Sequence, residues 1–203
     1  MRDYDDELAD IDDDADLLDD ELDTDDDEAS DDFDDGEGEE DDYEDATADE
    51  IDFVVALYRE DGQPNVVPMA FALANDLDDL ITMLRRFPGD AGATGVVSIN
   101  GEFFMMARVR GRDVRVLLSD AVAANFWPIA RDVADFLGAD IPGEDDASEP
   151  LGDLGLFADV GLREFDMETI IGDYEEDSDE MVRRVIKRLG YAAPFAAAVE
   201  NKA

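Results

Sequence analysis

Apolar runs at two different spacings divide the chain after residue 50 into expected strands and helices. The run IDFVVALY at residues 51–58 is apolar at nearly every position, which is typical of a strand buried on both faces. A turn signal at residues 60–63 separates it from a shorter apolar run at residues 66–69. The two runs predict a hairpin, and Pro68 suits a sheet edge or a strand end because it lacks a backbone donor.

A meander of three strands is expected at residues 95–118. Apolar residues at 95–99 and 103–109 flank Asn100-Gly101, a pair that favours the positive φ angles of a type I′ turn. The chain turns again before a third alternating run at residues 114–118. In the middle strand successive side chains point to opposite faces. One face is predicted to be core and the other to change from apolar to basic, the two sets being Phe103, Met105, Ala107, Val109 and Phe104, Met106, Arg108, Arg110.

Two amphipathic helices are expected in the middle of the chain. The first has an apolar stripe over residues 73–84, with Asn75 as the candidate N-cap and Pro88-Gly89 after its end. The second begins at Ser119 or Asp120, and Gly138 stands at its expected C-terminal stop. Its predicted stripe is Val122, Phe126, Ile129, Val133 and Phe136. Because Pro128 removes a backbone donor, a break near Trp127 is expected.

The last quarter of the chain is predicted to be mostly helical. Residues 139–153 contain Pro, Gly, Ser and acidic residues without periodicity, so they are expected to form a loop. Helical segments are then expected at residues 154–162, at 166–172, from the cap Ser178 to Gly190, and from Pro194.

These elements predict an α+β fold, with a mostly antiparallel sheet of about five strands packed by two helices and followed by a helical C-terminal region. The expected organisation is an acidic tail at residues 1–50, an α+β core domain at 51–138, a flexible acidic loop at 139–153, and a helical region at 154–203 that packs on the core.

Charge sets the first fifty residues apart. They contain thirty Asp or Glu side chains and one basic side chain, Arg2, which gives a net charge of −29 out of −44 for the whole chain. Like charges this close repel within the Debye length of about 8 Å, and few apolar groups are present to offset chain entropy. The tail is therefore predicted to be disordered.

The chain contains no His and no Cys, and this composition excludes several classes of enzyme. Zinc hydrolases and zinc deaminases use imidazole or thiolate ligands, and Ser-His-Asp or Cys-His catalysis needs an imidazole. Neither a Walker sequence nor a G-x-G-x-x-G sequence occurs. A calcium loop around Gly36 would place Phe33 at a ligand position. The sequence therefore predicts no catalytic, metal-binding or cofactor-binding residues.

Two groups of basic residues are the candidate contacts with a partner or an anion: Arg108, Arg110, Arg112, Arg115 on adjacent strands, and Arg183, Arg184, Lys187, Arg188 on the last long helix. The alternative, which we favour, is that they are solvated edge residues and cations at a helix C-terminus. The net charge of −15 on residues 51–203 repels phosphate, so direct nucleic-acid binding is not expected.

Other side chains have both a structural and a functional interpretation. Phe126 and Trp127 could stack on a base, but core packing is the favoured interpretation. Asp145 and Asp146 in the loop are interpreted as solvated acids. No membrane span, N-terminal leader or disulfide is expected, so the sequence predicts a soluble cytoplasmic protein.

An ordered set of segments runs through residues 51–200: FVVALYREDG at 53–62, LRRFPGD at 84–90, GVVSINGEFF at 95–104, VRVLLSDAVAA at 114–124, WPIARDV at 127–133, DLGLFADVGL at 153–162 and DEMVRRVIKRLG at 179–190. With this set, the chain resembles the tRNA adenosine deaminase-associated family of actinobacteria.

The resemblance implies a non-enzymatic accessory role with a tRNA adenosine deaminase as protein partner. The deaminase reaction itself needs zinc held by His and Cys, which this chain lacks. A different hypothesis is that the acidic tail mimics nucleic acid and inhibits or chaperones a basic nucleic-acid-binding protein.

Overall fold

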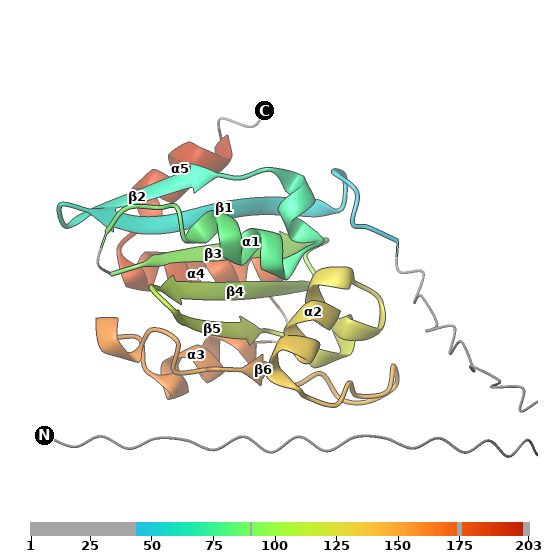
Figure 1. Cartoon of the computed structure of the whole chain (residues 1–203). Coiled ribbons are helices and arrows are strands. Elements are labelled where there is room, and N and C mark those ends of the chain that lie inside the picture. The colour runs from blue at the N-terminus through green and yellow to red at the C-terminus, as the bar shows by residue number, and fades with distance from the viewer. Residues whose placement is uncertain (1–43, 90, 174–175, 201–203) are drawn as a thin grey trace, which may run out of the picture. The chain divides into compact units, whose positions relative to one another are not determined.

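A six-stranded antiparallel sheet forms the centre of the fold, with helices on both faces (Figure 1). The computed structural model describes residues 44–89, 91–173 and 176–200, so the predicted disorder of residues 1–43 lies outside the described residues. The strands are β1 (Ile51–Glu60), β2 (Gln63–Pro68), β3 (Ala93–Ile99), β4 (Phe103–Arg110), β5 (Asp113–Leu118) and β6 (Leu151–Gly152). Their order in the sheet is β2-β1-β3-β4-β5-β6, and the α+β prediction is confirmed.

The sixth strand, β6, lies in the segment that was predicted to be a loop. It has only two residues, with Leu151 paired to Leu118 and Gly152 paired to Leu117. Gly152 has a φ of 103°, and a Cβ there would lie 2.3 Å from the carbonyl oxygen of Val116. Close approach to β5 therefore requires glycine at this position.

The helical elements form two layers. On one face lie η1 (Phe71–Ala74), α1 (Leu77–Leu84), η2 (Ala121–Asn125) and α2 (Pro128–Leu137). On the other lie η3 (Ala158–Val160), α3 (Glu164–Ile171), α4 (Ser178–Leu189) and α5 (Ala192–Glu200). None of the described helices has the length and apolar character needed to cross a membrane.

Each face of the sheet carries its own apolar core, because side chains alternate along the strands. Phe103 and Met105 of β4 pack in the core beneath α1 and α2. Phe104 and Met106 pack in the core beneath α3, α4 and α5. The second face was predicted to change from apolar to basic, and only the first was predicted to be core. The second face is a core as well, and even Arg108 near its end is only 6% exposed.

Two helix starts differ from the prediction. Asp76, and not Asn75, caps α1, and its carboxylate accepts a hydrogen bond of 2.7 Å from the amide of Asp79. Ser178 was predicted to be the cap of α4, but it is the first residue of that helix, and Asp177 holds the cap position. Ser178 is buried, and its hydroxyl lies 2.9 Å from that of Ser98 on β3. Its hydroxyl thus ties the helix to the sheet.

Asn75 has a different role, which moves the boundary of the folded part. Its side chain accepts a hydrogen bond from the amide of Ala46 at 2.8 Å and donates one to the Ala46 carbonyl at 3.1 Å. Ala46 is only 6% exposed and belongs to the core beneath α1 and α2. Residues 44–50, which were assigned to the acidic tail, therefore pack against the folded domain.

The break predicted near Trp127 is confirmed, but the predicted apolar stripe is wrong at two positions. Asp120 caps η2, and α2 begins at Pro128. Phe126 and Phe136 are 51% and 46% exposed instead of buried, because Phe126 precedes α2 and Phe136 lies off the buried face of that helix. The predicted helix at 154–162 is reduced to η3, and α5 begins at Ala192, two residues before Pro194.

Candidate partner-binding surface

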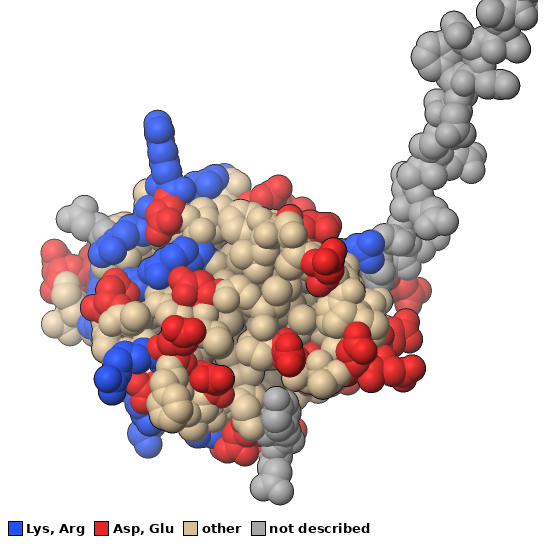
Figure 2. Space-filling model, turned by 90° about the horizontal axis from the view of Figure 1, so that it is seen from below, with Lys and Arg blue, Asp and Glu red and all other residues tan. Residues whose placement is uncertain are grey.

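Basic and acidic side chains are unevenly distributed over the described residues. On the face shown in Figure 2, Lys and Arg gather at one end among Asp and Glu, and the opposite end carries mainly Asp and Glu. The basic groups singled out in the sequence occupy β4, the turn after it, β5 and the second half of α4.

The guanidinium of Arg108 makes its contacts within the fold. Its guanidinium donates to the carbonyl oxygen of Leu156 at 2.7 Å and to both carboxylate oxygens of Asp159, the longer bond being 2.9 Å. It also lies over the ring of Phe157, 5.5 Å from its centroid. These bonds hold the pKa of Asp159 below its usual range. Arg108 does not lie at the surface with the other candidates.

Most of the remaining candidates have acidic partners. The ion pairs are Arg110–Asp159 at 3.8 Å, Arg115–Asp153 at 3.1 Å, Arg183–Glu180 at 3.3 Å, Arg184–Asp173 at 2.9 Å and Arg188–Asp166 at 3.5 Å. Among the eight candidates, Arg112 and Lys187 alone have no ion pair with a described residue. Neighbouring carboxylates therefore oppose the attraction of these residues for phosphate.

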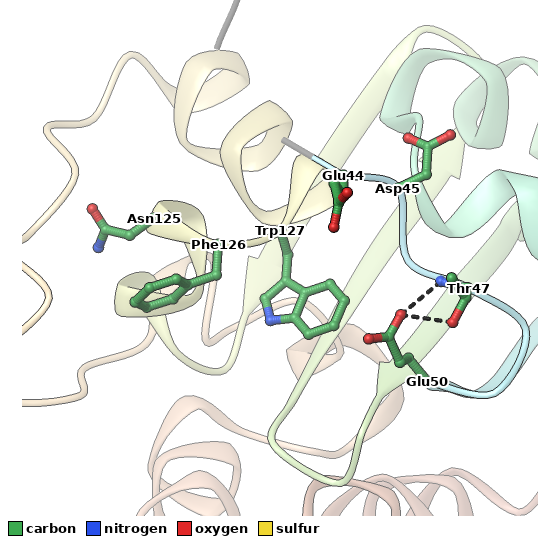
Figure 3. Close-up of a pocket in the computed structure, with 7 residues that line it drawn as sticks. All are labelled: Glu44, Asp45, Thr47, Glu50, Asn125, Phe126 and Trp127. Carbon is green, nitrogen blue, oxygen red and sulfur yellow. Dashed lines mark hydrogen bonds between the residues drawn. The ribbon is translucent and has the colours of Figure 1, made fainter. Parts of the chain in front are cut away.

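An open depression lies between the segment before β1 and the junction of η2 with α2 (Figure 3). Its free volume is about 940 Å³. It is lined by four residues of the first segment and three of the second: Glu44, Asp45, Thr47, Glu50, Asn125, Phe126 and Trp127. Among the described residues, this lining contains three carboxylates, two aromatic side chains and no Lys or Arg.

Local bonds fix the acidic side of the depression. The amide and the hydroxyl of Thr47 both donate to one carboxylate oxygen of Glu50, each at 2.8 Å. The two bonds lower the pKa of Glu50, so this carboxylate stays ionised at neutral pH. This Thr-x-x-Glu arrangement holds the turn that leads into β1.

The aromatic side of the depression follows from the break before Pro128. Trp127 packs partly on the core, with its ring 6.0 Å from that of Phe103, and in Figure 3 its indole points toward the segment of Thr47 and Glu50. The core packing predicted for Trp127 is thus only part of its environment. Asn125 holds the junction through bonds to the carbonyl oxygens of Val122 at 3.0 Å and Pro142 at 2.9 Å.

Carboxylates beside one exposed and one half-buried aromatic ring, those of Phe126 and Trp127, suit a cationic side chain. Lys or Arg gains from the negative charge and from the face of an aromatic ring within about 6 Å. Among the residues that the structure describes, no group of three or more acidic side chains has an arrangement that could hold a metal ion. The sequence interpretation missed the depression because its two halves are about eighty residues apart.

Comparison with known proteins supports the resemblance found in the sequence. Residues 52–192 match the family model described as Rv3753c-like tRNA adenosine deaminase-associated protein. The chain belongs to this family. Protein Rv3753c of Mycobacterium tuberculosis is 34% identical over 152 residues, which cover 73% of this chain and 88% of that protein. No solved structure matches the chain.

The matched region does not contain the whole depression. Asn125, Phe126 and Trp127 lie within residues 52–192 of the family match, whereas Glu44 to Glu50 lie before it. The aromatic side of the depression is therefore part of the family region, and the acidic side belongs to the segment that precedes it.

Proposed function

We propose that this chain is a non-catalytic accessory protein that binds a tRNA adenosine deaminase in the cytoplasm. One observation carries the proposal: the chain belongs to a family described as associated with such a deaminase, yet it has no His and no Cys. Deamination of a base by a zinc enzyme requires a water molecule on zinc, held by His and Cys ligands. The reaction therefore belongs to the partner.

The acidic depression is the contact surface that we propose for this partner. A protein that binds tRNA presents Lys and Arg to the phosphates, so its surface is basic around the RNA site. A chain with a net charge of −44 attracts such a surface. The depression brings together three carboxylates, those of Glu44, Asp45 and Glu50. Its aromatic rings, those of Phe126 and Trp127, can contact a cationic side chain.

A charge reversal in the depression tests this surface. Changing both Glu44 and Asp45 to Lys in the full chain should weaken binding to the deaminase at least about tenfold, because it puts two cations opposite the partner's own. The matched control changes Glu164 and Glu168 to Lys, which alters the net charge equally on exposed positions of α3. Isothermal titration calorimetry measures both affinities. Equal loss in the two variants would show that only overall charge matters.

The acidic composition favours a second candidate function. Thirty acidic residues among the first fifty could mimic a nucleic-acid backbone and occupy the basic site of a nucleic-acid-binding protein. In this case the N-terminal sequence alone would bind, and RNA would compete with it. The accessory function instead requires the folded domain.

A further inference from the structure

A small pocket lies on the α4 face of the sheet, at the end where β4 finishes. Its floor is a row of residues across three strands, because Leu57 of β1 pairs with Thr94 of β3, and Thr94 pairs with Arg108 of β4. Gly92 continues the floor, and Leu189 and Tyr191 close the pocket from the end of α4. The free volume is about 50 Å³. One water needs roughly 10–15 Å³ by this measure, so the space suits a group of a few non-hydrogen atoms.

Arg59 gives one wall of this pocket a positive charge. Its guanidinium donates to the carbonyl oxygens of Leu189 at 2.9 Å and Gly62 at 3.1 Å, and it lies 5.0 Å from the centroid of the Tyr191 ring. Within the described residues no carboxylate pairs with it. The bond to Leu189 caps the end of α4, and the bond to Gly62 holds the turn between β1 and β2. Together they use two of the five N–H groups of the guanidinium, which leaves others for a ligand.

Arg108 forms the opposite wall. Its guanidinium is stacked on Phe157 and shares its charge with Asp159, whose carboxylate is 38% exposed. The two guanidiniums line one pocket with a single carboxylate paired to them among the described residues. The pocket is therefore a positive site within a chain of net charge −44.

Two hydroxyl groups that can donate hydrogen bonds line the pocket, those of Thr94 and Tyr191. Thr94 is only 5% exposed, and its hydroxyl makes no hydrogen bond with any described residue. Tyr191 is 9% exposed, and burial raises the pKa of its hydroxyl, which therefore keeps its proton at neutral pH. Since the Thr94 hydroxyl is not among the fully enclosed side-chain atoms that lack a partner in the described residues, water or a ligand in the pocket can reach it.

We propose that this pocket binds an oxyanion of the size of phosphate, held by Arg59 with Thr94 and Tyr191 as neutral donors and Arg108 as a second positive charge. The N–H groups of Arg59 that do not donate to Leu189 or Gly62 can form charge-assisted hydrogen bonds to an oxyanion. Inorganic phosphate and the phosphate group of a small ester share this chemistry. All four residues lie within the region matched by the family model.

Titration of the full chain with inorganic phosphate tests the site. The backbone amide signals of Gly92, Thr94 and Tyr191 should shift and saturate in two-dimensional NMR spectra. Arg59→Gln should weaken the fitted affinity at least about tenfold, since it removes a charge-assisted pair of bonds. Thr94→Val removes only the hydroxyl and should weaken it several-fold. The control Arg86→Gln, at an exposed position outside the pocket, should leave the affinity unchanged.

The outcomes separate specific binding from general salt effects. Phosphate also stabilises proteins by exclusion from their surface, and that effect does not depend on Arg59. The proposal is overturned if the wild type shows no saturable shift at tens of millimolar phosphate, or if both Arg59→Gln and Thr94→Val retain the wild-type affinity. If Arg59→Gln does not fold, the phosphate affinity of Thr94→Val alone tests the proposal. A parallel titration with glycerol 3-phosphate distinguishes the two sources, because tighter binding of the ester would identify a phosphate group of a larger ligand.

Discussion

Replacement of Phe104 by Ala is expected to lower the free energy of unfolding by about 3–5 kcal/mol, because it removes a large buried ring and leaves a cavity. Phe104 has no exposed surface, and it lies in the core between the sheet and the helices α3, α4 and α5. The sequence predicted that this face of the sheet changes from apolar to basic, and it did not predict a second core there. Urea denaturation measures the change, and the slope of the transition should stay the same.

The matched control for this prediction is Phe165→Ala on α3. Phe165 is 76% exposed, so its loss should change the free energy of unfolding by less than about 0.5 kcal/mol. Equal, small effects of the two substitutions would contradict a second core on this face of the sheet.

Replacement of Arg108 by Met is expected to lower the free energy of unfolding by about 2–3 kcal/mol. The change leaves the Leu156 carbonyl and the Asp159 carboxylate without their buried donor, and bonds to charged groups contribute about 1.5–3 kcal/mol. We expect less than the loss of a fully buried ion pair, because Asp159 is 38% exposed and solvent screens its charge. Asp159→Asn, which removes the charge but keeps an acceptor, should cost less than Arg108→Met.

The pH dependence of the Arg108→Met effect follows from the pKa of Asp159, which Arg108 lowers. A lowered pKa in the folded state means that the contribution to stability is full above the unfolded value of about 4 and is lost as the pH falls through the folded value. The difference between wild type and Arg108→Met should therefore be largest near neutral pH and shrink in acid. A difference that stays constant into acid would mean that Arg108 contributes only packing.

Local sequence signals predicted much of the fold because they depend on the backbone of a few neighbouring residues. Asn100 and Gly101 have φ angles of 55° and 66°, as the predicted type I′ turn requires. Gly138 and Gly190 end their helices in the left-handed conformation. The continuous apolar run of β1 correctly indicated burial on both faces.

The features that sequence reasoning missed depend on tertiary contacts. A two-residue strand such as β6 is too short to show alternation, and its pairing is visible only beside β5. Arg108 alternates with apolar residues as a surface residue would, but Asp159 and Leu156, about fifty residues later, provide partners for its buried guanidinium. The sequence around position 108 does not indicate either contact.

The acidic depression and the proposed anion-binding pocket could not be predicted from the sequence, for the same reason. The depression joins residues 44–50 to residues 125–127, and the bonds between Asn75 and Ala46 hold the first segment to the domain. The proposed anion-binding pocket joins residues that strand pairing brings together on β1, β3 and β4 to residues at the end of α4. In both cases the sequence supplied the residue types, and the fold supplied their proximity.

Binding kinetics with the tRNA adenosine deaminase of the same organism test most directly the central claim that the folded domain carries the specific contact. Three ligands are compared by surface plasmon resonance at several salt concentrations: the full chain, residues 44–203 and residues 1–43. The shortened chain begins at Glu44 because Ala46 is part of the core beneath α1 and α2.

Long-range attraction by the acidic N-terminal sequence raises the association rate and is screened by salt, but it contributes little to a desolvated interface. Residues 44–203 should therefore bind with a lower association rate, a weaker salt dependence and a nearly unchanged dissociation rate. If residues 44–203 do not bind while residues 1–43 bind with nearly the full affinity, the folded domain does not carry the specific contact. Mimicry of nucleic acid then becomes the function of this chain.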